Sequence, residues 1–203
     1  GTFISKREVT RLIEALPKNI LLVYDAAYAE YIVNEDYTDG ISFVEKYENF
    51  LTTRTFSKLH GLAGLRLGWA YGSRDIINIL SSVRGPFSVN SMAIQAGILA
   101  IKDVKFQKKC VNYNLKNMKW MEIELDKLNL SYQNSVTNFI LIKFPNIKRF
   151  SAKEAEIYLA KKGVLVRGMS AYNLSNYLRV SLGTEKENKI VIEILKKFLR
   201  DLR

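Results

Sequence analysis

Apolar residues recur along the chain with two spacings, one typical of amphipathic helices and the other typical of buried strands. A capping box at Ser5–Glu8 and the apolar residues that follow at helical spacing predict a helix that ends at Pro17. Continuous apolar-leaning runs predict buried strands at residues 20–24, 49–55 and 67–71. Helices and strands therefore alternate in the first half of the chain, as they do in an α/β domain.

The second half opens with a long, charged, amphipathic segment, which predicts a helix to about Leu128. The buried positions expected in this helix are Val111, Leu115, Met118 and Ile123. Two further capping boxes begin helices, the last of which is expected to run to about Leu202. Apolar runs predict strands at residues 137–144, 164–167 and 177–182. We interpret this order of elements as a small α+β domain, and we expect domains at residues 1–105 and 106–203.

The amino-acid composition limits which class of protein this can be and which partners it is expected to bind. Apolar residues make up 48% of the 203 positions and aromatic residues 11%, which is typical of a globular protein. No apolar run is long enough to cross a membrane. The net charge of +11 comes from lysines scattered along helical segments, without aromatic platforms for bases, so we expect neither a nucleic acid nor a membrane as partner. The single cysteine excludes an intrachain disulfide and suggests the reducing cytoplasm, and we expect no bound metal.

Candidate chemistry gathers in a glycine-rich stretch, Thr55–Trp69, that follows a predicted strand. Its glycines let backbone and ligand approach closely, and the amine of Lys58 could form an imine with a carbonyl compound. The planar guanidinium of Arg66 would suit a phosphate group. A lysine in such a loop is more commonly a solvated charge, so a second motif is needed. Asp25 supplies one, because it ends another predicted strand, the usual position of catalytic groups in open α/β sheets.

Together these residues form two motifs in a fixed order and separation. The first is Tyr24-Asp25-x-x-Tyr28-Ala29-Glu30-Tyr31, and the second is Thr55-x-Ser57-Lys58-x-x-Gly61-Leu62-Ala63-Gly64-Leu65-Arg66-x-Gly68. The pair resembles the motifs of the pyridoxal-phosphate-dependent aminotransferases of fold type I, and most closely those of the histidinol-phosphate aminotransferases. The resemblance runs to about residue 200. It implies an α/β fold, in which the second half of the large, mixed-sheet cofactor domain precedes a small α+β C-terminal domain.

The resemblance also implies a role for each matching residue. Asp25 would keep the ring nitrogen of pyridoxal 5′-phosphate protonated, and Tyr28 would donate a hydrogen bond to its phenolic oxygen. Lys58 would bind the cofactor as a Schiff base and then move a proton, while Thr55, Ser57 and Arg66 would hold its phosphate. For His60, the only histidine, we expect a packing or supporting role.

Three residues of the second half are candidates for binding substrate. Arg179 lies inside an apolar strand, where a charge is costly unless it is paired. On the resemblance, Arg179 would bind the substrate α-carboxylate, Arg167 would bind a substrate phosphate, and Asn138 would face the same pocket. Salt bridges to nearby glutamates are the alternative for both arginines.

The resemblance implies transfer of an amino group between histidinol phosphate and 2-oxoglutarate, by a homodimer that takes small amino and keto acids. A lyase resembling threonine-phosphate decarboxylase is one alternative, and a basic, non-catalytic interaction module is another. The chain begins at Gly1, which in the resembling enzymes would close a turn far from the start of the protein. We therefore expect a back half, with the glycine-rich phosphate loop and the ring-stacking aromatic residue of the family encoded upstream.

Overall fold

The computed structural model describes residues 1–200. Its contacts divide the chain into two compact units, with the boundary after Val111, inside helix α5 (Val104–Lys127). The N-terminal unit comprises residues 3–111. The C-terminal unit comprises residues 112–200 together with Gly1 and Thr2.

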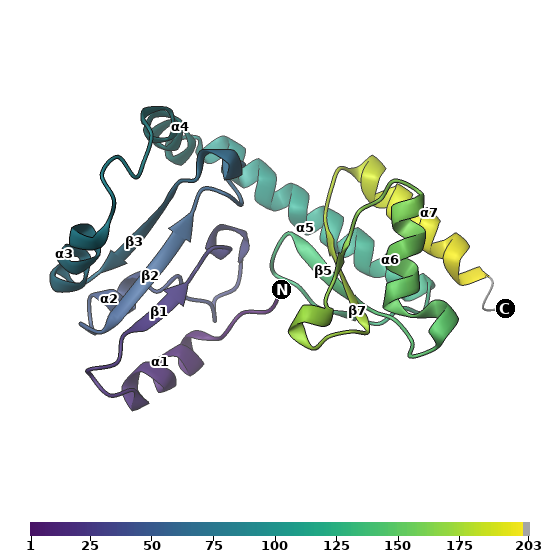
Figure 1. Ribbon diagram of the computed structural model, residues 1–203, viewed down its shortest axis with the longest axis horizontal. Helices are drawn as coiled ribbons and strands as arrows, with labels where there is room; N and C mark the ends of the chain where they lie inside the picture. Colours follow the sequence, from purple (N-terminus) through teal and green to yellow (C-terminus); the bar gives the residue numbers. More distant parts are fainter. Residues whose placement is uncertain (201–203) are drawn as a thin grey trace. The chain divides into compact units, whose positions relative to one another are not determined.

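The N-terminal unit is built on a three-stranded mixed sheet in the order β1-β2-β3 (Figure 1). Its strands are β1 (Leu22–Asp25), β2 (Phe50–Thr55) and β3 (Gly68–Gly72). β1 runs parallel to β2 and β3 runs antiparallel to it, so Asp25 lies opposite Thr53 and Thr55 lies opposite Gly68. All three predicted strands are present, with ends shifted by one or two residues. The parallel pair brings the carboxyl ends of β1 and β2 to the same edge of the sheet.

Four α-helices accompany this sheet: α1 (Lys6–Ala15), α2 (Ile41–Val44), α3 (Arg74–Val83) and α4 (Ser91–Lys102). As predicted, Ser5 begins α1, because its hydroxyl accepts a hydrogen bond from the backbone N–H of Glu8. The apolar faces of α1 and α2 meet β2 in a small core of Val9, Ile13, Phe43, Val44 and Phe50. Short 3-10 turns, η1 (Ala29–Tyr31) and η2 (Ala63–Leu65), follow β1 and β2.

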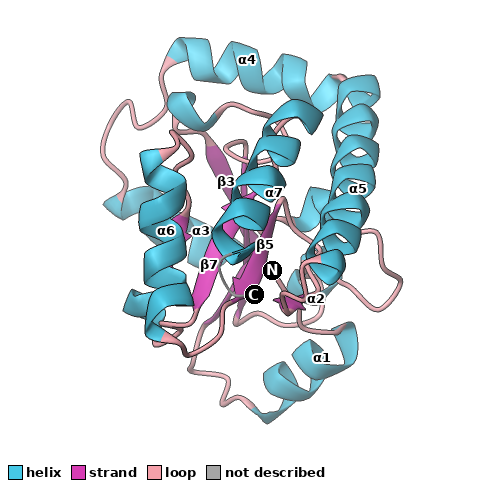
Figure 2. Cartoon of the chain, turned by 90° about the vertical axis from the view of Figure 1, so that its right-hand side faces the viewer, coloured by secondary structure: helices cyan, strands magenta, loops and turns pink. Residues whose placement is uncertain are grey.

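The C-terminal unit has an antiparallel four-stranded sheet in the order β4-β5-β7-β6. The strands are β4 (Tyr132–Gln133), β5 (Phe139–Lys143), β6 (Arg167–Gly168) and β7 (Tyr177–Ser181). In Figure 2, α7 (Glu185–Arg200) lies in front of β5 and β7, with α6 (Ala152–Lys161) on one side of it and α5 on the other. Side chains from these three helices pack on one face of the sheet, against Ile140, Ile142, Leu178 and Val180. Two 3-10 turns, η3 (Lys148–Phe150) and η4 (Ser170–Tyr172), complete the unit.

The predicted buried face of α5 is wrong for most of its length. Met118 is buried, but Leu115 and Ile123 are each 45% exposed. The helix instead buries Asn114, Asn117, Met118, Met121 and Leu125. Two asparagines lie on this face because their side chains find hydrogen-bond partners inside the unit.

Other differences are smaller. The two-residue strand β6 shares only Arg167 with the predicted strand at residues 164–167, and the sequence pattern did not indicate β4. The capping boxes at Ser151–Glu154 and Thr184–Glu187 begin α6 and α7 as predicted. The predicted end of α7, near Leu202, lies outside the described residues.

Candidate functional site

Asp25 lies where the parallel strands β1 and β2 end. Its Oδ1 accepts hydrogen bonds from the backbone N–H of Ala27, at 3.2 Å, and from the hydroxyl of Thr53, at 3.3 Å. The backbone N–H of Ala26 donates to the carbonyl of Thr53, which ties the end of β1 to β2. The carboxylate is thus held in one orientation although Asp25 is exposed.

Lys58 and Tyr28 come together at the same edge. The chain turns after β2 because the hydroxyl of Thr55 accepts a hydrogen bond from the backbone N–H of Ser57, at 3.0 Å. This turn directs Lys58 so that its Nζ lies 5.1 Å from the centroid of the Tyr28 ring, close enough for a cation–π contact. Two residues separated by about thirty positions in the sequence are therefore neighbours in the structure.

The loop from Lys58 to β3 brings a guanidinium back to the hydroxyl residues. Nη1 of Arg66 donates to the carbonyl of Ala63 at 2.7 Å and lies 3.5 Å from Oγ of Ser57. Arg66 has a positive φ of 54°, so the loop holds it in the left-handed region. Gly68 follows because a Cβ there would lie 2.8 Å from the carbonyl oxygen of Arg54. Thr55, Ser57 and Arg66 are therefore close to one another beside Lys58.

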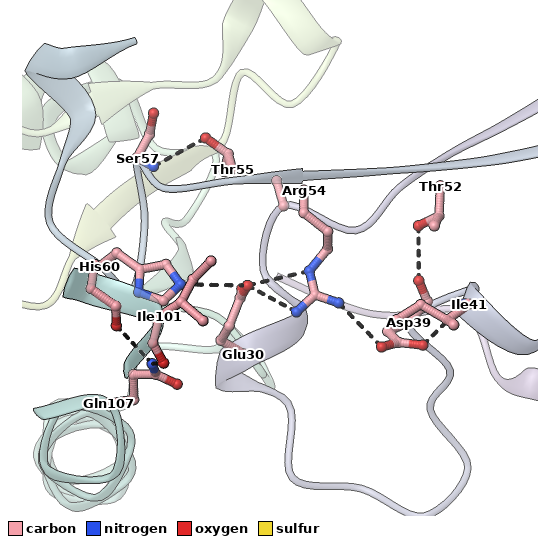
Figure 3. Close-up of polar contacts among 12 residues, drawn as sticks. Glu30, Asp39, Ile41, Thr52, Arg54, Thr55, Ser57, His60, Ile101 and Gln107 are labelled. Atoms are coloured by element: carbon pink, nitrogen blue, oxygen red, sulfur yellow. Dashed lines mark hydrogen bonds and ion pairs between the residues drawn. The ribbon is translucent and has the colours of Figure 1, made fainter. Parts of the chain in front are cut away.

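A buried network that sequence reasoning did not find lies beside this group (Figure 3). Nε and Nη2 of Arg54 donate to Oε1 of Glu30 at 3.2 and 2.9 Å, and Nη1 donates to Oδ2 of Asp39 at 3.2 Å. The side chains of Arg54 and Glu30 are each only 13% exposed. An arginine inside an apolar-leaning strand was the available signal, since the same pattern singled out Arg179.

His60 touches the same network. Its Nε2 lies 4.0 Å from Oε1 of Glu30, and its ring lies 4.9 Å from the ring of Phe56. Burial lowers the pKa of His60 below its ordinary value, although the charge of Glu30 acts in the opposite direction and raises it. His60 thus packs inside the loop, next to the network, where burial disfavours its protonated form.

Arg167 and Arg179 are directly opposite each other on β6 and β7. The Arg167 guanidinium donates to the hydroxyl of Tyr172 at 3.1 Å, and that of Arg179 lies 5.0 Å from the ring centroid of Phe139. Within residues 1–200 neither arginine is paired with a carboxylate, and the buried Nε of Arg179 has no hydrogen-bond partner. Both line a cavity of about 700 Å³ in the C-terminal unit.

Asn138 stands just before β5 and is half-buried. Its carbonyl accepts a hydrogen bond from the backbone N–H of Leu182, at 2.8 Å, which extends the pairing of β5 with β7. In the described part of the chain, no group of three or more His, Cys, Asp and Glu residues could hold a metal ion. Nor does any helix within residues 1–200 have the length and apolar character needed to cross a membrane.

A family model, aminotransferase class I and II, matches residues 1–195. The chain belongs to this family. Among curated members, the histidinol-phosphate aminotransferase of Maricaulis maris is 45% identical over 200 residues, which are 98% of this chain and 55% of that protein. This aminotransferase-family chain therefore spans about half the length of the curated relatives it matches.

Solved structures share the fold of this chain. The crystal structure of histidinol-phosphate aminotransferase from Sinorhizobium meliloti, in complex with pyridoxal-5′-phosphate, matches all of this chain and 55% of its own, with a TM-score of 0.91 and 24% identity. That of L-threonine-O-3-phosphate decarboxylase from Porphyromonas gingivalis matches 98% of this chain and 61% of its own, with a TM-score of 0.81 and 23% identity. The predicted α/β fold of the fold type I aminotransferases is confirmed.

Proposed function

We propose that this chain is part of a pyridoxal-phosphate-dependent histidinol-phosphate aminotransferase. The reaction would convert histidinol phosphate and 2-oxoglutarate into imidazole acetol phosphate and glutamate, in histidine biosynthesis. The observation that carries the proposal is the grouping of Asp25, Tyr28 and Lys58 at the edge where β1 and β2 end. The 45% identity to a curated enzyme of that name supports the choice of substrate.

The residues of this edge fit pyridoxal phosphate. Thr55, Ser57 and Arg66 offer two hydroxyls and a guanidinium beside Lys58, a donor set suited to a phosphate. The loop between Lys58 and Arg66 is open at Gly61 and Gly64, because a Cβ on either would meet nothing within 4 Å. When bound, the cofactor supplies an electron sink for the bond to the substrate α-carbon.

Three side chains of this chain would then hold the cofactor and transfer protons. Asp25, whose orientation Thr53 and Ala27 fix, would hold a proton on the cofactor's ring nitrogen. Nζ of Lys58 would hold the cofactor at its aldehyde carbon, and as a free amine it would accept the proton that leaves the substrate α-carbon. The Tyr28 hydroxyl would donate a hydrogen bond to the phenolic oxygen of the cofactor.

Substrate recognition would use the arginine pair of the C-terminal unit. Nε of Arg179 is buried without a partner in the described chain, and an α-carboxylate would supply one. Arg167, which lines the same cavity of about 700 Å³, would bind the phosphate of histidinol phosphate. Asn138, which directly precedes β5, would face the substrate as well. We further propose that the N-terminal unit is part of the large domain, that the C-terminal unit is the small domain, and that the complete enzyme is a cytoplasmic homodimer.

A second candidate is a lyase of the threonine-phosphate decarboxylase type, which the similarity to the Porphyromonas gingivalis structure favours. It would use the same Lys58 and Asp25. A decarboxylase releases carbon dioxide from its substrate and needs no keto acid, so assays with and without 2-oxoglutarate separate the two reactions. A non-catalytic interaction module would stay colourless with pyridoxal phosphate.

The test of the cofactor site is covalent trapping in the complete protein. Borohydride should reduce bound pyridoxal phosphate onto Lys58, and peptide mass spectrometry should find the adduct on that residue. Lys58→Ala should abolish it, whereas Lys102→Ala, which changes an exposed lysine at the end of α4, should not. An adduct on another lysine would show that the site is misassigned.

A further inference from the structure

One carboxylate oxygen, Oε1 of Glu30, connects three segments of the N-terminal unit. It accepts two hydrogen bonds from Arg54 on β2 and lies 4.0 Å from Nε2 of His60 in the loop after Lys58. Glu30 itself belongs to η1, the turn that follows Tyr28. Figure 3 shows Glu30 between the other two side chains, with dashed contacts to both.

The positions of these residues along the chain matter as much as the contacts. Glu30 comes two residues after Tyr28, and Arg54 and His60 enclose Lys58 on either side in the sequence. The ion pair therefore joins the segment that carries Tyr28 to the strand that leads into the Lys58 turn. Tyr28 and Lys58 lie on the two segments that the Arg54–Glu30 pair holds together. The pair therefore influences the distance from Nζ of Lys58 to the Tyr28 ring.

Arg54 is also fixed at its other end. Nη1 donates to Asp39, whose Oδ1 accepts from the backbone N–H of Ile41 and whose carbonyl accepts from the hydroxyl of Thr52. Asp39 is thereby held at the start of α2 and beside β2. The guanidinium of Arg54 is held by Asp39 as well as by Glu30, so it is fixed in one orientation. The hydrogen bonds from Arg54 therefore fix the position of the Glu30 carboxylate.

We propose that Glu30 and Arg54 are positioning residues, which act through Tyr28 to hold its hydroxyl and the Lys58 amine in register for the reaction. This inference rests on the proposed function, since it assigns Tyr28 and Lys58 to one cofactor site. A largely buried ion pair contributes little net stability, and the role we assign to this pair is to specify one arrangement of the segments it joins. Small displacements of a catalytic group reduce the rate strongly.

The test is a double-mutant cycle in the complete protein loaded with pyridoxal phosphate. Glu30→Gln keeps the shape and one acceptor oxygen but removes the charge, and Arg54→Lys keeps the charge but removes the planar fork. Each should lower kcat on the order of tenfold or more, with little change in KM. In a Tyr28→Phe background the same changes should cost almost nothing further, because the hydroxyl that they position is already absent.

A spectroscopic readout accompanies the kinetics. The absorbance of the Lys58-bound cofactor, titrated with pH, should show an apparent pKa that rises in Glu30→Gln and Arg54→Lys, in the same direction as in Tyr28→Phe. Glu14→Gln is the matched control, because Glu14 contacts Lys46 and Tyr47 on the exposed surface, and it should change neither readout.

Independent, multiplying losses in the Tyr28→Phe background, or a lower unfolding temperature with unchanged kcat and cofactor pKa, would overturn the inference. Failure of the proposed function itself looks different. In that case the wild-type protein shows no reducible cofactor on Lys58, whatever the variants do.

Discussion

Arg54 and Arg179 each lie in a strand of a sheet, yet their surroundings differ. The guanidinium of Arg54 is satisfied by Glu30 and Asp39. Arg179 faces a second arginine, Arg167, and its Nε lacks a partner within the described residues. Like charges directly opposite each other on a sheet are destabilising, so this pair suits an anionic ligand rather than a structural role.

The two arginines should therefore separate substrates by charge. In the complete enzyme, Arg179→Ala should weaken binding of every amino and keto acid, because all carry the α-carboxylate. Arg167→Ala should weaken histidinol phosphate far more than an aromatic amino acid. Loss of the contact made by the half-buried Arg179 should cost on the order of 2–4 kcal/mol, measured from kcat/KM, and loss of the contact made by the exposed Arg167 should cost less. Equal losses for both substrates in Arg167→Ala would contradict a phosphate-binding role.

His60 should titrate below its ordinary pKa of about 6.5. Burial is the main cause, and Glu30 partly opposes it, so Glu30→Gln should lower the pKa of His60 further. The native state then binds fewer protons than the unfolded state just below pH 6.5, so the contribution of His60 to stability is complete above that pH and is lost as the pH falls. The pKa of His60 can be measured from the imidazole NMR signals of the complete protein, assigned by their loss in His60→Gln. A pKa above 6.5 would contradict the burial argument.

Among the helices, local sequence signals predicted where three helices begin, whereas the buried face of α5 was predicted wrongly. Ser5, Ser151 and Thr184 each begin a helix as predicted, because a cap depends only on residues three positions apart. The face of α5 depends on distant partners instead. Asn114 donates to the carbonyl of Thr137 and Asn117 accepts from Asn188, and a hydrophobic pattern has no means of showing either.

The same distinction holds for the site. Asp25, Tyr28 and Lys58 could be named from motifs, and the structure brings them to one edge, which the parallel pairing of β1 and β2 explains. The Arg54–Glu30 pair could not be named, since it joins a strand to a turn 24 residues away. Its partners become visible only once the chain is folded.

Asn188 connects α7 to α5 by a buried side-chain hydrogen bond. It is 1% exposed, its Nδ2 donates to Asn117 and to the carbonyl of Gly183, and its Oδ1 accepts from the N–H of Gly183. Asn188→Ala would leave Oδ1 of Asn117 and the backbone N–H and carbonyl of Gly183 without their hydrogen bonds. It should lower the free energy of unfolding of α7 by about 2–3 kcal/mol. Hydrogen exchange of α7 amides in the complete protein would measure this, with Lys189→Ala, an exposed neighbour, as control. Equal protection in the two variants would show that this connection does not stabilise α7.

At the scale of the whole molecule, the N-terminal unit exposes many large apolar side chains. They include Trp69 and Tyr71 of β3, Ile79, Leu80 and Val83 of α3, and Met92, Ile94, Ile98, Leu99 and Ile101 of α4. Exposed apolar residues on several neighbouring elements are unlike the scattered ones of an ordinary surface. The matched relative of Maricaulis maris, of which this chain spans 55%, has further polypeptide, and we expect polypeptide of that kind to cover these side chains.

Residues 1–203 expressed alone should consequently self-associate and should not turn over histidinol phosphate. Apolar side chains of α4 and the unpaired edges of β1 and β3 offer surfaces on which copies can meet. Light scattering and sedimentation should show association that weakens in a Leu99→Lys, Ile101→Lys variant. Val33→Lys adds a single charge at an exposed loop residue and serves as the control for Leu99→Lys alone, and it should change association less. A monodisperse chain 1–203 that binds pyridoxal phosphate and transfers amino groups would show that these surfaces need no cover.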